Sequence, residues 1–95
     1  MRWAAGVEPG AWAWVEDAPG LVLDTVKRAE DGGALVLRLY EAHGGRGVAR
    51  VGLARPFASA ARANLLEEPL EDANVADGAI AVPFRPWEVV TLLVR

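Results

Sequence analysis

ALVLRLYEAHGGRGVARVGLA, residues 34–54, contains two runs of alternating apolar residues around a glycine-rich turn at 42–47. In an extended chain successive side chains point to opposite faces, so every second residue shares a face. The leucines that share one face of the first run are Leu35, Leu37 and Leu39. The opposite face carries Val36, Arg38 and Tyr40 and is expected to be partly solvated. These features predict two β-strands that bury one face each.

The rest of the chain also alternates between short predicted strands and turns. Further strands are predicted at 21–27, 58–64, 79–84 and 87–94. The alanine-rich segment 58–64 could form a short helix by propensity, but its strand-and-turn neighbours favour a strand. Asp31-Gly32 and Asp77-Gly78 supply the positive φ angles of tight hairpin turns. Six or seven short strands with Gly or Pro turns between them predict an all-β fold, an antiparallel β-sandwich.

The closing segment WEVVTLLV, residues 87–94, is apolar on both faces apart from Glu88 and Thr91. A strand of this kind is usually covered on both sides. It is therefore expected to lie in the centre of its sheet.

Residues 1–20 are rich in glycine and proline and are expected to form a linker or N-terminal arm in front of a sandwich domain at 21–95. Trp12 and Trp14 share one face of an extended segment. The two tryptophans are expected to cover the core, or to contact a neighbouring domain.

The segment NLLEEPLE, residues 64–71, is too broken for a helix and too irregular for a central strand. Asn64 is expected to close a strand, because its side chain tolerates turn geometry. Leu65 and Leu66 are expected to anchor a crossing between the two layers, after which Leu70 returns to the core. Pro69 cannot donate to a β-ladder and so prevents pairing as a central strand. The acids Glu67 and Glu68 stay solvated or face a neighbouring domain.

The composition of the chain argues against several classes of function. The chain has 95 residues, 53% of them hydrophobic, and a net charge of −3, so one packed domain is expected. Its basic residues are scattered, which argues against nucleic-acid binding. No apolar run approaches the roughly 20 residues that span a bilayer. The absence of cysteine excludes disulfides and thiolate metal sites, and a cytoplasmic location is expected.

No complete catalytic or metal-binding constellation is visible in the sequence. His43 is the only histidine, and no carboxylate stands at ligand spacing from it. Ser59 is the only serine and lacks a nucleophile-elbow motif. Glu67 and Glu68 would point to opposite sides of a strand and so cannot act as a glycosidase pair. The alternative to a catalytic role for Glu41, Glu67 and Glu68 is that they are solvated on the surface or form an ion pair with Arg46 or Arg62.

Three segments in order carry a family resemblance: KRAEDGGALVLRLYEAHGGRGVARVGL, ARANLLEEPLE and VPFRPWEVVTLLVR. Together they resemble the extreme C-terminal region of bacterial α-mannosidases of glycoside hydrolase family 38, over roughly Leu21 to Arg95. The resemblance implies a parent enzyme that is a retaining α-mannosidase with a zinc ion and an aspartate nucleophile. Both belong to an N-terminal catalytic domain outside this chain, so no cofactor is expected in the chain itself.

On this resemblance, the chain is expected to be a non-catalytic β-domain that braces the catalytic domain. Its partners would be the catalytic and middle domains of the same polypeptide and, through the parent enzyme, a mannoside substrate. The residues considered for contacts with the active-site rim or a sugar are Tyr40, Glu41, His43 and Arg46. The residues considered for contacts between domains are Glu67, Glu68, Trp12 and Trp14.

Two alternatives remain open. The chain could be an autonomous carbohydrate-binding module, because aromatic faces pack on sugar rings. The tryptophans available for such a platform are Trp3, Trp12, Trp14 and Trp87. It could also be an assembly domain that mediates oligomer contacts.

Overall fold

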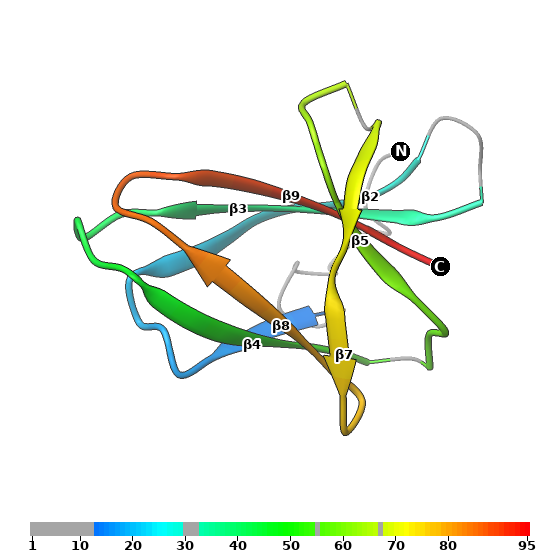
Figure 1. Ribbon diagram of the computed structural model, residues 1–95, viewed down its shortest axis with the longest axis horizontal. Helices are drawn as coiled ribbons and strands as arrows, with labels where there is room; N and C mark the ends of the chain where they lie inside the picture. Colours follow the sequence, from blue (N-terminus) through cyan, green and yellow to red (C-terminus); the bar gives the residue numbers. More distant parts are fainter. Residues whose placement is uncertain (1–12, 30–32, 55, 67) are drawn as a thin grey trace, which may run out of the picture.

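The computed structural model describes residues 13–29, 33–54, 56–66 and 68–95, in which nine strands form two antiparallel sheets. The four-stranded sheet has the order β1-β4-β8-β7 and consists of β1 (Ala13–Glu16), β4 (Gly47–Leu53), β8 (Ala79–Phe84) and β7 (Asn74–Ala76). The five-stranded sheet has the order β2-β3-β9-β5-β6 and consists of β2 (Leu21–Arg28), β3 (Leu35–Glu41), β9 (Val89–Val94), β5 (Ala60–Ala63) and β6 (Pro69–Asp72). Figure 1 shows the sheets as two layers, with β3 and β9 above β4 and β8. The predicted antiparallel β-sandwich is confirmed.

The core lies between the two layers and is built from the inward faces of the central strands. Its largest fully buried side chains include Leu37, Leu39, Val51, Ile80 and Leu92. Burial of each aliphatic side chain of this size contributes about 1.5–3 kcal/mol. The period-two pattern of the sequence therefore identifies the core-facing side of β3, β4 and β8 correctly.

The closing strand β9 lies between β3 and β5, in the centre of the five-stranded sheet as predicted. Val90 and Leu92 face the main core, whereas Leu93 packs with Val36 in a second buried cluster. The face of β3 that was expected to be mixed runs from fully buried Val36 to exposed Tyr40. Both faces of β9 are thus covered from Val90 to Val94, whereas Val89 is exposed, and this cover explains the two-sided apolar sequence.

The nine strands exceed by two or three the six or seven that the sequence predicts. Strand β1 lies within the segment expected to be a linker or arm, and it pairs with β4. Strands β6 and β7 follow the hairpin at 64–68, and both are exposed and short. The alanine-rich segment forms strand β5, not a helix.

The interpretation of residues 64–71 as a crossing between layers is wrong. Leu65, Leu66 and Leu70 are 68%, 80% and 67% exposed, so none of them anchors a crossing or returns to the core. Asn64 does close β5, but the chain then turns back in a hairpin and pairs β6 with β5. Pro69 is tolerated because β6 is an edge strand. The chain passes to the other sheet only at Ala73, between β6 and β7.

The predicted turns are confirmed where the structure describes them. Asp77 and Gly78 have φ angles of 53° and 75°, as a tight hairpin between β7 and β8 requires. The Asp31-Gly32 turn lies outside the described residues. Within the described ranges there is no helix of a length and hydropathy suited to crossing a membrane.

Candidate functional site

Three connections between the sheets meet at one end of the sandwich, which we call the loop end. They are residues 17–20 between β1 and β2, 42–46 between β3 and β4, and 85–88 between β8 and β9. The Ala42 N–H donates to the Gly20 carbonyl at 2.8 Å, and the Glu41 N–H donates to the Glu88 carbonyl at 2.9 Å. These bonds join the three connections to one another.

Glu41 is the centre of the loop end. Its side chain is 3% exposed, and its carboxylate accepts three backbone N–H groups. Oε2 accepts from His43 at 2.9 Å, and Oε1 accepts from Gly44 at 2.6 Å and from Trp87 at 3.0 Å. A single carboxylate therefore fixes the conformation of the 42–46 loop and ties that loop to the 85–88 loop.

The electrostatics of Glu41 follow from these bonds. Burial alone raises the pKa of its carboxyl, because it penalises the charged form. Backbone N–H groups of Trp87, Gly45, His43 and Gly44 favour the ionised form and lower the pKa from 4.5 to about 2. Glu41 is thus a carboxylate at neutral pH whose acceptor positions face the protein backbone, and it acts as a positioning residue for the loops.

Trp87 is the residue that this arrangement presents to solvent. Its side chain is 67% exposed, and its φ angle is 62°. Positive φ is rare for a bulky residue and persists only where the surroundings enforce it. The bond from its N–H to Glu41 is one such restraint. Its ring lies against Gly44, where an added Cβ atom would stand 2.9 Å from Cζ2 of Trp87.

The predicted rim residues all lie at the loop end but differ in availability. Tyr40 is 40% exposed and lies in register between Val22 of β2 and Val89 of β9. His43 and Arg46 are exposed on the 42–46 loop, while Glu41 is buried beneath them. Trp87 joins this group from a distant part of the sequence.

Of the four residues predicted to contact other domains, the structure describes Trp14 and Glu68, which lie on different elements. Trp12 and Glu67 lie outside the described residues. Trp14 is 43% exposed on β1 and pairs with Gly52 of β4, where an added Cβ atom would stand 2.5 Å from its indole ring. Glu68 is exposed in the β5–β6 hairpin. Gly52 thus leaves the space that the Trp14 ring occupies.

A groove of about 910 Å³ borders the loop end and is lined by residues from β4, β5, β6, β8 and β9. Arg62 and Glu88 form an ion pair in it at 3.3 Å. Arg62 also donates to the Pro83 carbonyl at 2.6 Å, and Glu88 accepts the Arg85 N–H at 2.9 Å. The partner of Arg62 in this ion pair is therefore Glu88, rather than one of the three glutamates considered from the sequence.

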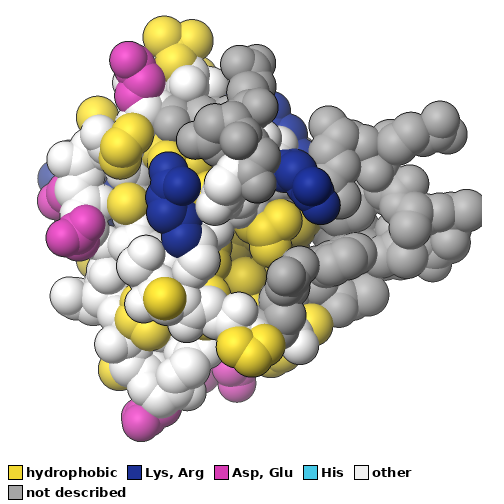
Figure 2. Space-filling view, turned by 90° about the vertical axis from the view of Figure 1, so that its right-hand side faces the viewer, with side chains coloured by type: hydrophobic (Ala, Val, Ile, Leu, Met, Phe, Trp, Pro, Cys, Tyr) yellow, Lys and Arg dark blue, Asp and Glu magenta, His cyan; other side chains and the backbone are white. Residues whose placement is uncertain are grey.

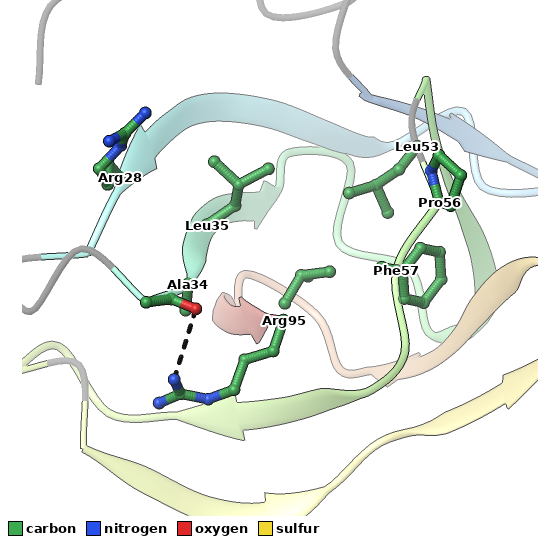
Figure 3. Close-up of a pocket in the computed structure, with 9 residues that line it drawn as sticks. Arg28, Ala34, Leu35, Leu53, Pro56, Phe57 and Arg95 are labelled. Carbon is green, nitrogen blue, oxygen red and sulfur yellow. Dashed lines mark hydrogen bonds between the residues drawn. The ribbon is translucent and has the colours of Figure 1, made fainter.

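A second, smaller pocket of about 250 Å³ lies at the opposite end of the strands. Figure 3 shows Leu35, Leu53 and Phe57 around it, with Arg28 and Arg95 at its edge. The space-filling view of this side shows hydrophobic side chains in a hollow (Figure 2). The Arg95 guanidinium donates to the Gly33 carbonyl at 3.5 Å. None of the predicted site residues that the structure describes lines this pocket.

The described residues were considered as ligands for a metal ion. No group of three or more His, Cys, Asp or Glu side chains in them could hold a metal ion. The zinc ion implied by the resemblance therefore does not fit the residues that the structure describes.

Comparisons with known proteins place these features in context. Residues 20–92 match the family described as "Glycosyl hydrolases family 38 C-terminal beta sandwich domain". Among curated proteins, Alpha-mannosidase 2C1 of Homo sapiens is 37% identical over 86 residues, and Alpha-mannosidase 2C1 of Mus musculus is 35% identical over 86 residues. Each alignment covers 85% of this chain but only 8% of the relative. The chain thus spans a small fraction of the length of these relatives.

Proposed function

The chain belongs to the C-terminal β-sandwich domains of glycosyl hydrolase family 38, and we propose that it is a non-catalytic domain of a zinc-dependent retaining α-mannosidase and braces that enzyme's catalytic domain. The observation that carries this proposal is the family match over residues 20–92. That range includes strands β2 to β8 in full and ends within β9. The two relatives, both named as α-mannosidases, are far longer than the matched segment.

The bracing role is supported by the construction of the loop end. Its loops are held by the buried Glu41 carboxylate and present Trp87 to solvent, and Tyr40 is exposed near the end of β3. Rigid aromatic side chains give a large contact area at a small entropic cost, which suits a permanent contact between domains. The catalytic zinc and the nucleophile are assigned by this proposal to another domain of the same polypeptide.

The test uses the 95-residue chain and the complete polypeptide encoded by the reading frame that contains it. The complete polypeptide is expected to hydrolyse aryl α-mannosides and to lose that activity with a zinc chelator. The isolated chain is expected to show no hydrolysis, with or without zinc. Turnover by the isolated chain, or a complete polypeptide without α-mannosidase activity, would overturn the proposal.

A second candidate function, an autonomous carbohydrate-binding module, is favoured by one observation. Trp87 is 67% exposed and its backbone N–H is bonded to Glu41, so an aromatic face is available to a sugar ring on a restrained loop. Exposed Tyr40, His43 and Arg46 would then contact sugar hydroxyls. Titration of the isolated chain with mannose and mannobiose, followed by the indole N–H resonance of Trp87, separates the candidates. A saturable shift favours the binding module, and an unchanged resonance favours the bracing domain.

A further inference from the structure

The β5–β6 hairpin, residues 64–70, concentrates exposed aliphatic side chains. Leu65, Leu66 and Leu70 are 68%, 80% and 67% exposed. Single exposed leucines are common on protein surfaces, but three on one short hairpin make that hairpin a candidate interaction site, and Leu70 also lines the groove beside the loop end. Figure 1 shows this hairpin projecting above the five-stranded sheet. Figure 2 shows hydrophobic and acidic side chains close together at the top of the molecule.

Asn64 restrains the described residues of the hairpin on both sides of its turn. Its Oδ1 accepts the N–H groups of Leu66 and Glu68 at 2.9 and 3.0 Å, and its Nδ2 donates to the Glu68 carboxylate at 2.9 Å. The Asn64 N–H also donates to the Glu68 carbonyl at 3.0 Å. A side chain that closes a turn in this way orders the hairpin before any partner arrives.

A second restraint ties the hairpin to the sheet. The Arg38 guanidinium, on β3, donates to the Leu65 carbonyl at 3.1 Å. The exposed leucines are therefore carried by an ordered backbone. Preorganisation lowers the entropic cost of binding, so the hairpin is built to present its leucines.

The charges around the leucines indicate which kind of partner surface would complement the hairpin. Glu68, Glu71 and Asp72 are exposed on and beside the hairpin, and these three acids outnumber the half-buried Arg38 guanidinium that contacts the Leu65 carbonyl. Two copies of the chain that met through this surface would bring these acids together, and like-charge contact disfavours association. A surface that is apolar at its centre and basic at its border complements the hairpin best.

We propose that the β5–β6 hairpin docks Leu65, Leu66 and Leu70 into an apolar pocket bordered by Lys or Arg side chains on the remaining part of the same family 38 polypeptide. This inference rests on the proposed function, because it takes the neighbouring domain of the enzyme as the partner. The short coverage of the relatives supports that choice, since 8% of each relative matches this chain. The hairpin is then a specific contact through which the domain braces the enzyme.

Hydrogen exchange tests the docking in the complete polypeptide. The amides of residues 64–66, 68 and 70 are expected to exchange at least about tenfold more slowly there than in the isolated chain. The double variant Leu65→Ser/Leu66→Ser is expected to remove this difference and to lower the Tm of the complete polypeptide by several degrees. It should change the Tm of the isolated chain little, because both side chains are exposed there. The matched control is Val48→Ser, which alters a side chain that is 58% exposed on β4.

The outcomes separate this inference from the proposed function. If the complete polypeptide is an α-mannosidase but the leucine variant behaves like Val48→Ser, the docking inference is wrong and the proposed function stands. If the polypeptide has no α-mannosidase activity, both are overturned. Concentration-dependent dimerisation of the isolated chain that the leucine variant abolishes would assign the hairpin to a second copy and overturn the docking inference.

Discussion

The carboxylate of Glu41 accepts the backbone N–H of Trp87 at 3.0 Å, across 46 residues of sequence. Glu41 ends β3, and Trp87 lies just before β9, the strand that pairs with β3. The same oxygen, Oε1, accepts the Gly44 N–H at 2.6 Å. One buried side chain thus links two loops that connect the layers, and it holds Trp87 at a positive φ angle.

Substitution of Glu41 by glutamine is expected to destabilise the chain. Glutamine has one acceptor oxygen where glutamate has two, and its amide N–H₂ group would face backbone donors. At least one of the three N–H groups now bonded to Glu41 would lose its partner. Thermal unfolding followed by circular dichroism should show a Tm lower by several degrees. Glu71→Gln, on the exposed edge strand β6, is the control and should leave the Tm nearly unchanged.

The stabilisation by Glu41 is expected to depend on pH. Burial raises the pKa of its carboxyl, but the backbone N–H bonds prevail and lower it from 4.5 to about 2 in the folded chain. The unfolded chain therefore binds more protons between these values, and stability increases with pH there. The contribution is fully present above about pH 4.5 and is lost as the pH falls towards about 2. The Tm difference between wild type and Glu41→Gln should shrink over this interval, and a constant difference would contradict the prediction.

The ordering of the β5–β6 hairpin is expected to depend on Asn64. Asn64→Ala removes the oxygen that accepts the Leu66 and Glu68 N–H groups. Each such hydrogen bond contributes about 0.5–1.5 kcal/mol net, so a small loss of stability and faster exchange of these two amides are expected. Amide exchange followed by NMR measures both effects. Asn64→Asp keeps the acceptor oxygen but loses the amide that donates to the Glu68 carboxylate, so it should retain only part of the protection. Equal exchange in both variants would contradict this role.

Several features of the fold could be predicted because they depend on local pattern. Alternating leucines identify the buried face of β3, and the two-sided apolar run identifies β9 as a central strand. Asp77-Gly78 identifies a hairpin turn, since both residues take positive φ angles. Strands β6 and β7 were missed because their sequences, PLED and NVA, are exposed at sheet edges and lack a buried face to impose alternation.

The features that could not be predicted depend on contacts between distant segments. The leucines at positions 65 and 66 were expected to be buried because they are apolar, but the hairpin places them beyond both layers. The role of Glu41 requires the register between β3 and β9, which brings Trp87 within reach of its carboxylate. The sequence does contain both partners of this contact: a glutamate at the end of the strand at 34–41, and an R-P-W-E turn before the closing strand. Their connection became visible only when the two strands were paired.

The contact between Trp87 and Gly44 gives a test that separates backbone strain from ring displacement. Gly44 and Gly78 have φ angles of 77° and 75°, so alanine at either position costs about 1–2 kcal/mol in backbone strain alone. At Gly44 the added Cβ would also stand 2.9 Å from Cζ2 of Trp87, whereas nothing lies within 4 Å of a Cβ at Gly78. Gly44→Ala is therefore expected to lower the Tm more than Gly78→Ala and, unlike it, to shift the Trp87 indole N–H resonance. Equal Tm losses with an unchanged indole resonance would show that the Trp87 ring does not depend on Gly44.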